Sequence, residues 1–580
     1  MRGEAPDVKI VVRPYAERAR QSLVDAGVHP VLARVYAARQ VRAAADLENA
    51  PTRLAPPARL AHAEAAGMLL ADALAGQRRI LIISDYDADG ATACAVGIRG
   101  LRALARACAV EPQVDYLVPN RFELGYGLSP ELVDLAAARK PDLVVTVDNG
   151  IASVEGVARA RELGIDVLIT DHHLPGPELP AARCIVNPNQ PGCAFPSKAL
   201  AGVGVMFYVV LALRAVLRAR GSFGTRSEPN LGALTDLVAL GTIADVVPLD
   251  ANNRILVSQG LKRIRAGQST PGIAALLHAA GRQHAETCAL DLGFLIGPRL
   301  NAAGRLADMG LGIECLITDD GGRAANIAQE LDQLNRERRR IETGMLEEAL
   351  DTLIEEARDF GAAFYRPGWH QGVIGILAAR LRERLHRPVV CFANAGQGAN
   401  AGLLRGSGRS VQGFHLRDCL DLMTKRAPGL ILRFGGHAQA AGLTLRVEDY
   451  PHFESLFAEV AAETMPPGVL SPVVETDGSL EPQHMTLRVA QMLSAQIWGQ
   501  GFPQPLFCDT FVTESQRVVG EKHLKLRLNR AGQRFEAIRF GSLEPFPGRV
   551  EAAYRLATNE YNGLRSVQLI VEHMQPAPRG

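Results

Sequence analysis

The sequence lacks several features that would narrow its function at once. Its nine cysteines are scattered and include no Cys-x-x-Cys pair, which argues against a zinc ribbon and against thiol redox chemistry. An odd number of scattered cysteines is typical of a chain kept in a reducing compartment. No apolar run of signal-peptide or membrane length stands at the N-terminus, so the sequence predicts a cytoplasmic protein without a membrane partner. The net charge of +1 identifies no polyanionic partner, and any basic surface must be local.

What the sequence does contain is a dense group of carboxylates directly after an apolar run. Residues 80–84 read ILIIS, which is typical of a strand buried on both faces of a parallel sheet. The hexapeptide at 85–90, Asp-Tyr-Asp-Ala-Asp-Gly, follows at once, and the small residues after it predict a helix. Open α/β sheets bind their ligands at the carboxyl ends of the strands. Because three carboxylates there repel one another, the pattern predicts a hard cation such as Mg²⁺ or Mn²⁺ between them.

The same spacing also opens a calcium-binding EF-hand loop, which is the main alternative for this stretch. That loop needs a bidentate Glu at its twelfth position, which here is Val96, and it needs a helix before it, where this chain has a predicted strand. The calcium-loop interpretation is therefore disfavoured.

Two more predicted strands end in residues that can bind metals. Strand and helix signals alternate through this region, as is typical of βαβ units, and further strands are expected at 114–118, 142–147 and 167–170. The last two are followed by Asp148-Asn149-Gly150 and by Asp171-His172-His173. A single strand-end Asp is more often a turn former or a helix cap. Three such groups after successive strands favour a metal site instead.

Together with several further stretches, these motifs resemble the DHH phosphoesterase superfamily. The fourth superfamily motif is matched by residues 240–245 (LGTIAD), and other similar stretches are 297–305 (GPRLNAAGR), 406–410 (GSGRS) and 435–437 (GGH). The resemblance spans about residues 75–565, and within the superfamily the chain is similar to bacterial single-strand-specific 5′→3′ exodeoxyribonucleases. It implies an α/β fold with a DHH-type parallel-sheet catalytic domain, a second α/β domain of the DHHA1 type and a C-terminal OB-like β-barrel.

The expected domain order has five parts. They are a helical N-terminal lead-in at 1–75, the DHH catalytic domain at 76–265, a helical connection at 266–360, the DHHA1 domain at 361–465 and an OB-like single-strand-binding domain at 466–580. A long helical pattern at 321–360 suggests a helix that bridges two domains. It contains the arginine-rich run 336–340, which is usually a solvated helix face, with nucleic-acid contact as the alternative.

The resemblance implies two divalent cations, Mn²⁺ or Mg²⁺, as cofactors. Their implied ligands are Asp87, Asp89, Asp148, His172 and Asp245, with Asp148 placed to bridge. Asp85 is a weaker ligand candidate that could orient the others from outside the coordination sphere. His173 would contact the scissile phosphate or its attacking water, so the implied catalytic set is Asp148, His172 and His173. Paired cations about 3.5–4 Å apart activate a water and stabilise the leaving oxygen.

Substrate-binding residues are implied in two places. Arg121, Arg299 and Arg305 resemble positions that face the substrate backbone or its 5′ end, although surface salt bridges would also explain them. The GSGRS stretch resembles an anion-binding loop, in which glycines turn backbone N–H groups toward phosphate while Ser407 and Arg409 add donors. His437 completes the implied substrate-binding set. Taken alone, GSGRS would be interpreted as an ordinary loop.

The C-terminal region changes character. Short runs of alternating apolar and polar residues between 505 and 571 predict a small antiparallel barrel or sandwich, and the resemblance favours an OB fold. Between Arg517 and Arg565 there are ten Lys or Arg and five Asp or Glu, a local excess of +5. Four aromatic residues could stack on bases, although strands bury about half of their aromatics. These residues are Phe535, Phe540, Tyr554 and Tyr561.

The sequence therefore predicts a metal-dependent hydrolase that degrades single-stranded DNA from its 5′ end to 5′-mononucleotides. By resemblance its processes are DNA repair, mismatch repair and recombination, and its partners are single-stranded DNA, a single-strand-binding protein and a RecQ-type helicase. The enzymatic alternative is a phosphodiesterase for cyclic dinucleotides or short oligonucleotides, which the chain length and the basic C-terminal region disfavour. A catalytically silent DNA-binding scaffold is the other alternative, and it expects missing ligands where none is missing.

Overall fold

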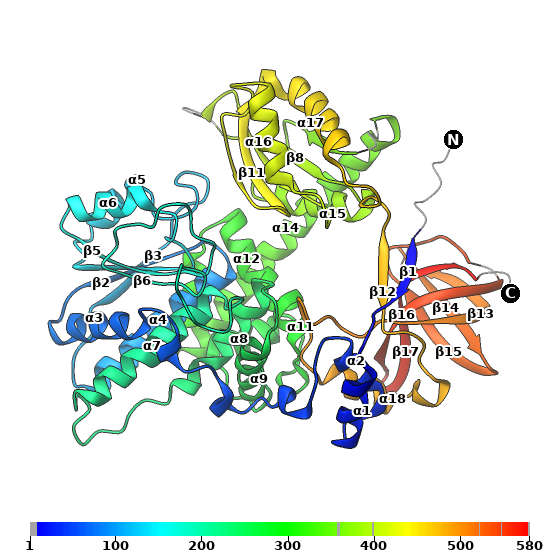
Figure 1. The fold of residues 1–580 in the computed structure, drawn as a ribbon, viewed down its shortest axis with the longest axis horizontal. Helices are drawn as coiled ribbons and strands as arrows, with labels where there is room; N and C mark the ends of the chain where they lie inside the picture. The colour runs from blue at the N-terminus through cyan, green and yellow to red at the C-terminus, as the bar shows by residue number, and fades with distance from the viewer. Residues whose placement is uncertain (1–7, 357–359, 397–399, 521, 547, 578–580) are drawn as a thin grey trace. The chain divides into compact units, whose positions relative to one another are not determined.

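The computed structural model of the protein describes residues 8–356, 360–396, 400–520, 522–546 and 548–577 (Figure 1). The chain forms two compact units. One comprises Met1–Ile10 and Gln333–Val474, and the other comprises Val11–Asp332 and Glu475–Gly580. The larger unit thus contains both the predicted parallel sheet and the C-terminal strands.

A five-stranded parallel sheet in the order β3-β2-β4-β5-β6 organises the larger unit. Its strands are β2 (Ile80–Ser84), β3 (Val114–Leu117), β4 (Leu143–Val147), β5 (Asp166–Thr170) and β6 (Cys184–Val186). Every residue of β2 and β4 is buried, as their continuous apolar runs predict. Helices cover both faces (Figure 1): α5 (Pro130–Ala137) and α6 (Val154–Glu162) on one, and α3 (Ala63–Ala75), α4 (Ala88–Ala107) and α7 (Gly202–Ala219) on the other. The α/β prediction is confirmed.

By length and composition α7 could cross a membrane, but 67% of it is buried inside the protein, as is typical of a core helix.

After α7 the chain forms a helical layer. Its members are α8 (Thr235–Ala244), α9 (Ala251–Arg265), α10 (Pro271–Ala279), α11 (Ala289–Asp291), a π-helical turn (Leu292–Ile296), α12 (Gly297–Leu306) and α13 (Gly310–Ile317).

The predicted all-helical lead-in is wrong at its start. Residues Lys9–Val12 form strand β1, which pairs with β12 (Val473–Thr476) in a two-stranded sheet. The β-branched sequence KIVV suits a strand, but its partner is too distant in sequence to be recognised from local pattern. Helices α1 (Glu17–Asp25) and α2 (Pro30–Ala37) follow, and Arg39 forms a buried bidentate ion pair with Asp477, at 2.7 and 3.0 Å.

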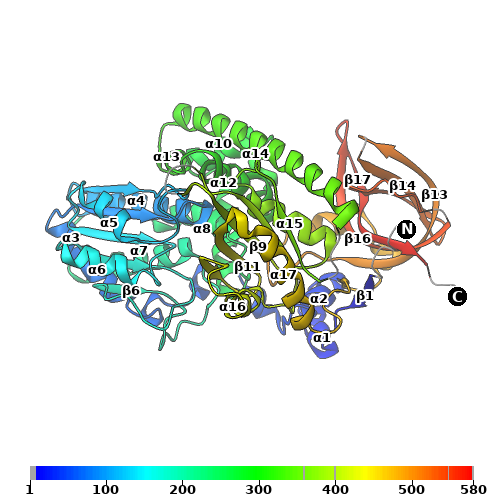
Figure 2. The same cartoon turned by 90° about the horizontal axis from the view of Figure 1, so that it is seen from above.

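The predicted bridging helix is α14 (Gly321–Glu356), which runs without interruption in Figure 2 and has residues in both units. The last part of the predicted pattern, 357–359, lies outside the described residues. Within the arginine-rich run, Arg340 pairs with Glu337. Arg338 is buried and pairs with Glu342 at 2.9 Å. The run therefore has partners inside its own helix.

The smaller unit contains a mixed sheet in the order β10-β11-β9-β8-β7. Its strands are β7 (Ala362–Tyr365), β8 (Val389–Asn394), β9 (Leu403–Arg409), β10 (Arg433–Gly436) and β11 (Ala440–Arg446), and its helices are α15 (Ile374–Leu385), α16 (Leu416–Arg426) and α17 (Tyr450–Thr464). The core holds Phe392, Phe453 and Phe457 between sheet and helices. This is the expected second α/β domain.

The expected GSGRS loop is instead a strand. Residues up to Arg409 belong to β9, whose backbone groups pair with β8 on one side and β11 on the other. Gly406 and Gly408 are present for packing: a Cβ at Gly406 would lie 2.5 Å from the Phe392 ring, and one at Gly408 would lie 2.6 Å from Leu416. The backbone N–H groups are therefore not presented to phosphate, and only side chains on the other face of β9 could serve that purpose.

The C-terminal strands close into a barrel in the order β13-β14-β15-β17-β16. The strands are β13 (Phe507–Val519), β14 (His523–Arg530), β15 (Gln533–Arg539), β16 (Gly548–Tyr561) and β17 (Leu564–Pro576), and α18 (Leu487–Ser494) precedes them. Phe535 and Tyr554 are core residues, whereas Phe540 and Tyr561 are 56% and 72% exposed. The expectation that half of the four aromatics are core is confirmed.

Candidate metal centre and substrate-binding residues

Strand register brings three acidic residues to one edge of the parallel sheet. Ser84 pairs with Val147, and Val147 pairs with Thr170, so the residues that follow these three begin side by side. They are Asp85, Asp148 and Asp171. Asp148 has a φ of 62°, in the left-handed region that non-glycine residues seldom adopt. Such backbone strain is concentrated at functional sites.

Seven side chains converge around this edge in three overlapping groups. Within each group the ligand atoms all lie within 4.8 Å of one another. The groups are Asp85, Asp87 and Asp148; Asp89, His172 and Asp245; and Asp148, His172 and His173. We call these seven residues the acidic cluster. Asp148 belongs to two groups, so its carboxylate lies where one side chain could serve two cations.

Unpartnered buried atoms indicate that the acidic cluster fits cations. Asp85 Oδ1, Asp148 Oδ1 and His172 Nε2 are buried and have no hydrogen-bond partner in the part of the chain that the structure describes. His172 Nε2 lies 3.1 Å from Asp148 Oδ1 and 3.5 Å from Asp245 Oδ2. Buried polar atoms without partners are costly unless something else binds them. Carboxylate oxygens with one imidazole are donors that suit Mn²⁺ and Mg²⁺.

Two of the aspartates also have structural roles. Asp87 is the N-cap of α4, and its Oδ1 accepts hydrogen bonds from the backbone N–H groups of Asp89 and Gly90. Asp89 accepts from the N–H groups of Gly202 and Val203, at 2.6 and 2.9 Å, at the start of α7. The helix-cap interpretation is therefore correct for Asp87, Asp89 caps α7 in the same way, and the role of both as metal ligands stays a prediction.

Burial and mutual repulsion raise the pKa of the carboxyls in the acidic cluster. Burial is the larger cause for Asp85, Asp148 and Asp245, whose pKa values lie well above the usual range, and the neighbouring aspartates add to it. For Asp89 burial, followed by the charge of Asp87, raises the pKa to about 7. Without a cation, several of these groups hold protons near neutral pH.

The pKa values of the adjacent histidines are shifted in opposite directions. Burial lowers the pKa of His172 to about 4, which leaves a neutral imidazole with a lone pair for a cation. Burial also opposes ionisation of His173, but its Nδ1 lies 2.7 Å from Asp171 Oδ1, and this hydrogen bond raises its pKa. Asp171 in turn keeps a lowered pKa despite its burial, because His173 and the Ile151 N–H donate to it.

These pKa shifts predict that cation binding depends on pH. A cation must displace protons from the cluster, so the affinity for Mn²⁺ should rise from about pH 6 to about pH 8, by about tenfold per pH unit for each displaced proton. Calorimetry in buffers of different ionisation enthalpy measures the released protons. An affinity independent of pH, with no proton release, would contradict the prediction.

The same shifts set the sign of the stability change. A carboxyl whose pKa is higher in the folded than in the unfolded protein stabilises the folded state at low pH. This contribution is complete below the unfolded-state pKa of about 3.9, and it is lost as the pH rises through the folded-state pKa. For Asp89 that window extends from about pH 4 to about 7. The cation-free protein should lose stability across this range, so the gain in Tm on adding Mn²⁺ should be larger at pH 8 than at pH 6.

Two neighbours of the acidic cluster were not predicted as functional residues. Asp171 orients both histidines, since its Oδ1 accepts the backbone N–H of His172 and the Nδ1 proton of His173. It lies inside a recognised motif, but its hydrogen bonds are visible only in the structure. The Tyr126 hydroxyl lies 2.9 Å from His173 Nδ1 and donates to the Asp148 carbonyl at 3.0 Å. No signal in the sequence points to Tyr126.

The predicted arginines of the larger unit have different environments. Arg121 lies over the Tyr86 ring, at 4.5 Å from its centroid, and donates to the Gly304 carbonyl at 3.4 Å. Arg305 follows Gly304 on α12, beside the 85–90 motif. Arg299 is only 8% exposed and forms an ion pair with Asp332 at 2.7 Å. Arg299 therefore forms a salt bridge, the alternative that the sequence analysis left open for these arginines. The structure does not bring Arg299 into the acidic cluster.

Helix α12 approaches the 85–90 motif through a glycine. A Cβ at Gly304 would lie 2.0 Å from the Tyr86 carbonyl oxygen, and Asn301 Oδ1 accepts the Ala88 N–H at 2.8 Å. Gly304→Ala should therefore displace the motif and destabilise folding by about 1–3 kcal/mol. Gly344→Ala on α14, where a Cβ would meet nothing within 4 Å, is the control and should stabilise by about 0.5–1 kcal/mol. Denaturant unfolding measures both, and equal effects would contradict this packing role.

Ser407, Arg409 and His437 belong to the smaller unit. Ser407 and Arg409 share one face of β9, where Arg409 Nη1 donates to Ser407 Oγ at 3.2 Å. A Cβ at Gly375, in the first turn of α15, would lie 3.0 Å from Ser407 Oγ and 3.2 Å from Arg409 Nη2. His437 follows β10, and its N–H donates to Ala440. The strand face and the start of α15 together place two side-chain donors at a helix N-terminus.

Comparisons with known proteins identify all three regions. Residues 79–242 match the model of the DHH family N-terminal domain, residues 344–463 match the DHHA1 domain, and residues 476–573 match the RecJ OB domain. The chain is 51% identical over 562 residues to the single-stranded-DNA-specific exonuclease RecJ of Escherichia coli, covering 94% of this chain and 96% of that protein. It is also 51% identical to the Dickeya dadantii RecJ, covering 97% of this chain and 98% of that one.

Solved structures agree. The fold superposes on the crystal structure of Thermus thermophilus RecJ in complex with Mn²⁺ with a TM-score of 0.82 and 30% identity, over 98% of this chain and 80% of that one. For the complex of that protein with Mg²⁺ the TM-score is 0.74 and the identity 29%, over 99% and 78% of the chains. Sequence similarity over nearly the full length, three matching domains and the same fold lead to one conclusion: the chain belongs to the RecJ family of DHH exonucleases.

Proposed function

We propose that this protein is a metal-dependent exonuclease that hydrolyses single-stranded DNA from its 5′ end and releases 5′-mononucleotides. The observation that carries the proposal is the acidic cluster, in which Asp85 Oδ1, Asp148 Oδ1 and His172 Nε2 are buried without a hydrogen-bond partner among the described residues. Two divalent cations held there would polarise the phosphate and lower the pKa of an attacking water. Asp85, Asp87 and Asp148 would hold one cation, and Asp89, His172 and Asp245 would hold the other. Asp148 Oδ1 lies 3.1 Å from His172 Nε2, close enough for this carboxylate to be shared between the two.

His173, the one residue of the acidic cluster not assigned to a cation, would contact the reacting phosphate. Despite burial, its hydrogen bond to Asp171 raises its pKa, which favours the protonated ring that can donate to a phosphate oxygen while its Nδ1 stays bound to the carboxylate. Asn187 and Asn189 donate to the carbonyls of His173 and His172, at 2.9 and 2.6 Å, and hold this segment in place. One imidazole with a raised pKa beside one with a lowered pKa is the arrangement expected of one substrate-contacting group and one metal ligand.

Recognition of the 5′ end is assigned to the Ser407 and Arg409 side chains at the start of α15. A helix N-terminus favours phosphate through its partial positive charge, and the guanidinium and hydroxyl supply donors. Arg121 and Arg305 are proposed contacts to the substrate backbone in the larger unit, and His437 is one in the smaller unit. Arg299 is proposed here only as a structural support, because its guanidinium is buried with Asp332.

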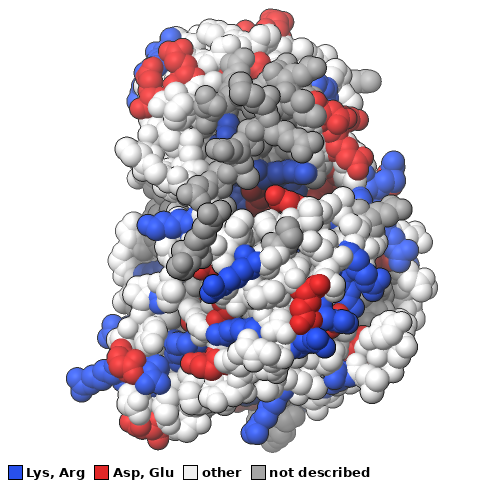
Figure 3. Space-filling model, turned by 90° about the vertical axis from the view of Figure 1, so that its right-hand side faces the viewer, with Lys and Arg blue, Asp and Glu red and all other residues white. Residues whose placement is uncertain are grey.

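The barrel is proposed to bind single-stranded DNA away from the cleavage site. Basic and acidic side chains are interspersed on the face shown in Figure 3, and pairs such as Arg527 with Glu536 neutralise part of the local excess. Exposed aromatics are therefore assigned the larger role. Tyr561→Ala should weaken binding of long strands several-fold, since base stacking contributes about 1–3 kcal/mol per base. Fluorescence anisotropy with strands of different length tests this, with the buried-ring variant Phe535→Leu as control; unchanged affinity would exclude stacking on Tyr561.

A single-strand-binding protein and a RecQ-type helicase are proposed partners in repair and recombination in the cytoplasm. This assignment is based on family resemblance. Co-sedimentation of each purified partner with the full chain tests it, and the absence of a complex at micromolar concentration would count against that partner.

Degradation of end-labelled strands tests the proposed activity. With Mn²⁺ or Mg²⁺ present, a 5′-labelled strand should release labelled mononucleotide in the first turnovers, while a 3′-labelled strand should shorten progressively. Duplex DNA of the same sequence is the control and should be resistant. Release of mononucleotides from the 3′ end, or cleavage of dinucleotides but not of long strands, would overturn the proposal.

A further inference from the structure

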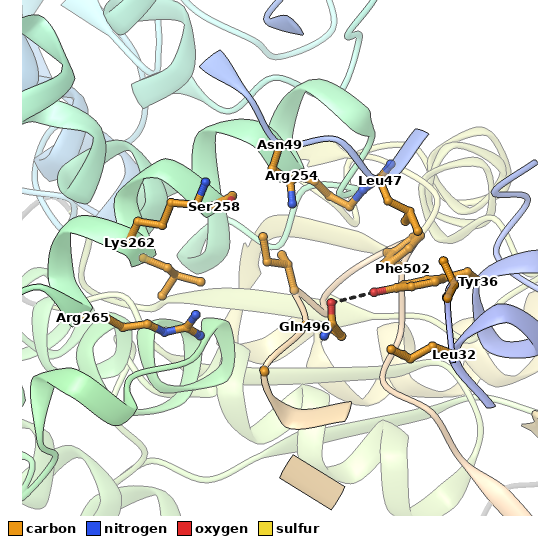
Figure 4. Close-up of a pocket in the computed structure, with 14 residues that line it drawn as sticks. Leu32, Tyr36, Leu47, Asn49, Arg254, Ser258, Lys262, Arg265, Gln496 and Phe502 are labelled. Carbon is orange, nitrogen blue, oxygen red and sulfur yellow. Dashed lines mark hydrogen bonds between the residues drawn. The ribbon is translucent and has the colours of Figure 1, made fainter. Parts of the chain in front are cut away.

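A cavity of about 310 Å³ lies in the larger unit, and none of the residues that line it belongs to the acidic cluster. Three segments distant in sequence form it: residues 28–49, which include α2, helix α9, and residues 495–502 before the barrel (Figure 4). The Tyr36 hydroxyl donates to Gln496 Oε1 at 2.8 Å, and the Leu249 N–H donates to the Gln500 carbonyl at 2.8 Å. These hydrogen bonds connect the residues before the barrel to α2 and to the residues just before α9. We call this cavity the α9 pocket.

One face of α9 gives the α9 pocket a positive charge. Arg254, Ser258, Lys262 and Arg265 recur at helical spacing and all line it, and no Asp or Glu is among its lining residues (Figure 4). Within the described part of the chain, none of the three cationic side chains, Arg254, Lys262 and Arg265, forms an ion pair. Lys262 and Arg265 lie three residues apart on this face, so their charges repel each other, and an anion between these two would remove that repulsion.

The guanidinium groups of the α9 pocket are held in place by neutral partners. Arg254 donates to the carbonyls of Leu249 and Asp46, at 2.9 and 3.1 Å, and lies 4.6 Å from the centroid of the Phe502 ring. Arg265 Nε donates to the Thr287 carbonyl at 2.7 Å. Burial lowers the pKa of Arg254 more than the nearby charges of Asp250, Tyr36 and Asp46 raise it. Carbonyls orient these side chains but leave their charge available.

The remaining wall is suited to an uncharged ring. Leu32, Leu47 and Leu261 supply apolar surface, and Asn49 and Ser258 add an amide and a hydroxyl. Neither of these two polar side chains has a hydrogen-bond partner among the described residues. Amides and hydroxyls at the edge of an apolar surface are the groups that bind a heterocyclic base, while Arg and Lys bind phosphate. At about 310 Å³ the cavity is near the lower limit of ligand pockets, a size for one nucleotide and not for a strand.

We propose that the α9 pocket binds a nucleoside 5′-monophosphate, with the phosphate between Lys262 and Arg265 and the base against Leu32, Leu47 and Asn49. The ligand would contact α2, α9 and the segment before the barrel at once. It would therefore stabilise the packing of the N-terminal helices on the rest of the larger unit. This site is separate from the acidic cluster, and its occupancy does not depend on the proposed nuclease activity.

Calorimetric titration of the full chain with dAMP in the presence of a chelator tests the proposal, because without cations the acidic cluster repels phosphate. Binding of dAMP is expected, with inorganic phosphate and deoxyadenosine each at least about tenfold weaker. Lys262→Gln should weaken dAMP about tenfold, the loss expected for a charge-assisted contact. Arg263→Gln is the matched control, since Arg263 lies on the same helix but does not line the pocket, and it should leave the affinity unchanged.

Thermal unfolding is a second measurement, and it detects dAMP binding even where the heat of binding is small. Saturating dAMP should raise the Tm of the wild type and of Arg263→Gln, and it should raise the Tm of Lys262→Gln less. The proposal is overturned if Lys262→Gln binds dAMP as the wild type does, or if millimolar dAMP does not bind. It is also overturned if inorganic phosphate binds as tightly as dAMP, which would show an anion site without nucleotide recognition. Loss of nuclease activity in the end-label assay would leave these binding results unaffected.

Discussion

Asp148→Ala is expected to reduce cleavage of single-stranded DNA by more than about a hundredfold, while the affinity for DNA stays largely unchanged. Asp148 belongs to two of the three ligand groups, and its Oδ1 is buried without a hydrogen-bond partner. Removing it would take a ligand from both cation positions at once. A hundredfold loss is the low end of what one acid–base group contributes, and a shared ligand should exceed it. A carboxylate that holds cations contributes little to contacts with the strand itself.

Two measurements separate this role from a structural one. Single-turnover cleavage gives the rate loss, and titration with Mn²⁺ followed by Tm gives the loss of cation binding. Denaturant unfolding of the cation-free variant shows whether its fold is kept, since loss of carboxylate repulsion favours it while Ala at a φ of 62° disfavours it. Asp134→Ala, which removes a surface partner of Arg159, is the control and should keep full activity. Retention of more than about a hundredth of the wild-type rate would rule out the bridging role.

Arg409→Ala should lower activity on 5′-phosphorylated strands more than on 5′-hydroxyl strands. A water activated by cations in the acidic cluster would attack any phosphodiester placed there, so direction must come from a group that distinguishes the end. A terminal phosphate carries more charge than an internal one and is suited to the Ser407 and Arg409 donors at the start of α15. A charge-assisted arginine contact contributes about 1.5–3 kcal/mol, or roughly 10- to 150-fold in affinity.

The ratio of kcat/KM for the two substrates measures this preference directly. Arg409→Lys keeps the charge but not the planar pair of donors, so it should recover only part of the preference. Arg426→Ala, which breaks a surface pair with Glu463 in the same unit, should change neither substrate. Equal losses on the two substrates, or a wild type indifferent to the 5′ group, would leave Arg409 as a general backbone contact.

Much of the parallel sheet and of the acidic cluster could be predicted, because both depend on local sequence. An apolar strand followed by carboxylates identifies its own carboxyl end, and neighbouring parallel strands end at the same edge. Strand β6 was not predicted because it has only three residues, Cys184–Val186, too few for a pattern. Strand β1 was predicted as helix because its pairing partner, β12 (Val473–Thr476), lies too far along the sequence to be recognised from local pattern.

The features that the sequence missed or left open have a common physical origin in tertiary packing. GSGRS has the composition of a loop, yet its glycines belong to a strand because Phe392 and Leu416 leave no space for a Cβ. The role of Asp171 depends on hydrogen bonds to the two histidines, and the role of Arg299 depends on Asp332. Local propensity contains no information on which residue lies opposite another. Residue types at strand ends were predictable, and their partners were not.

The cap that Asp89 makes on α7 affects how substitutions at this position would be tolerated. An inactive descendant of this protein could lose His172 or Asp245 at little cost to its fold, since both serve mainly the cluster. Loss of Asp89 would also leave the Gly202 and Val203 N–H groups without acceptors at the start of a core helix. Selection would therefore retain Asp89 after catalysis had disappeared. A relative with an aspartate at the position of Asp89 but no histidine at the position of His172 has therefore retained the cap of α7, and this aspartate alone is no evidence of nuclease activity.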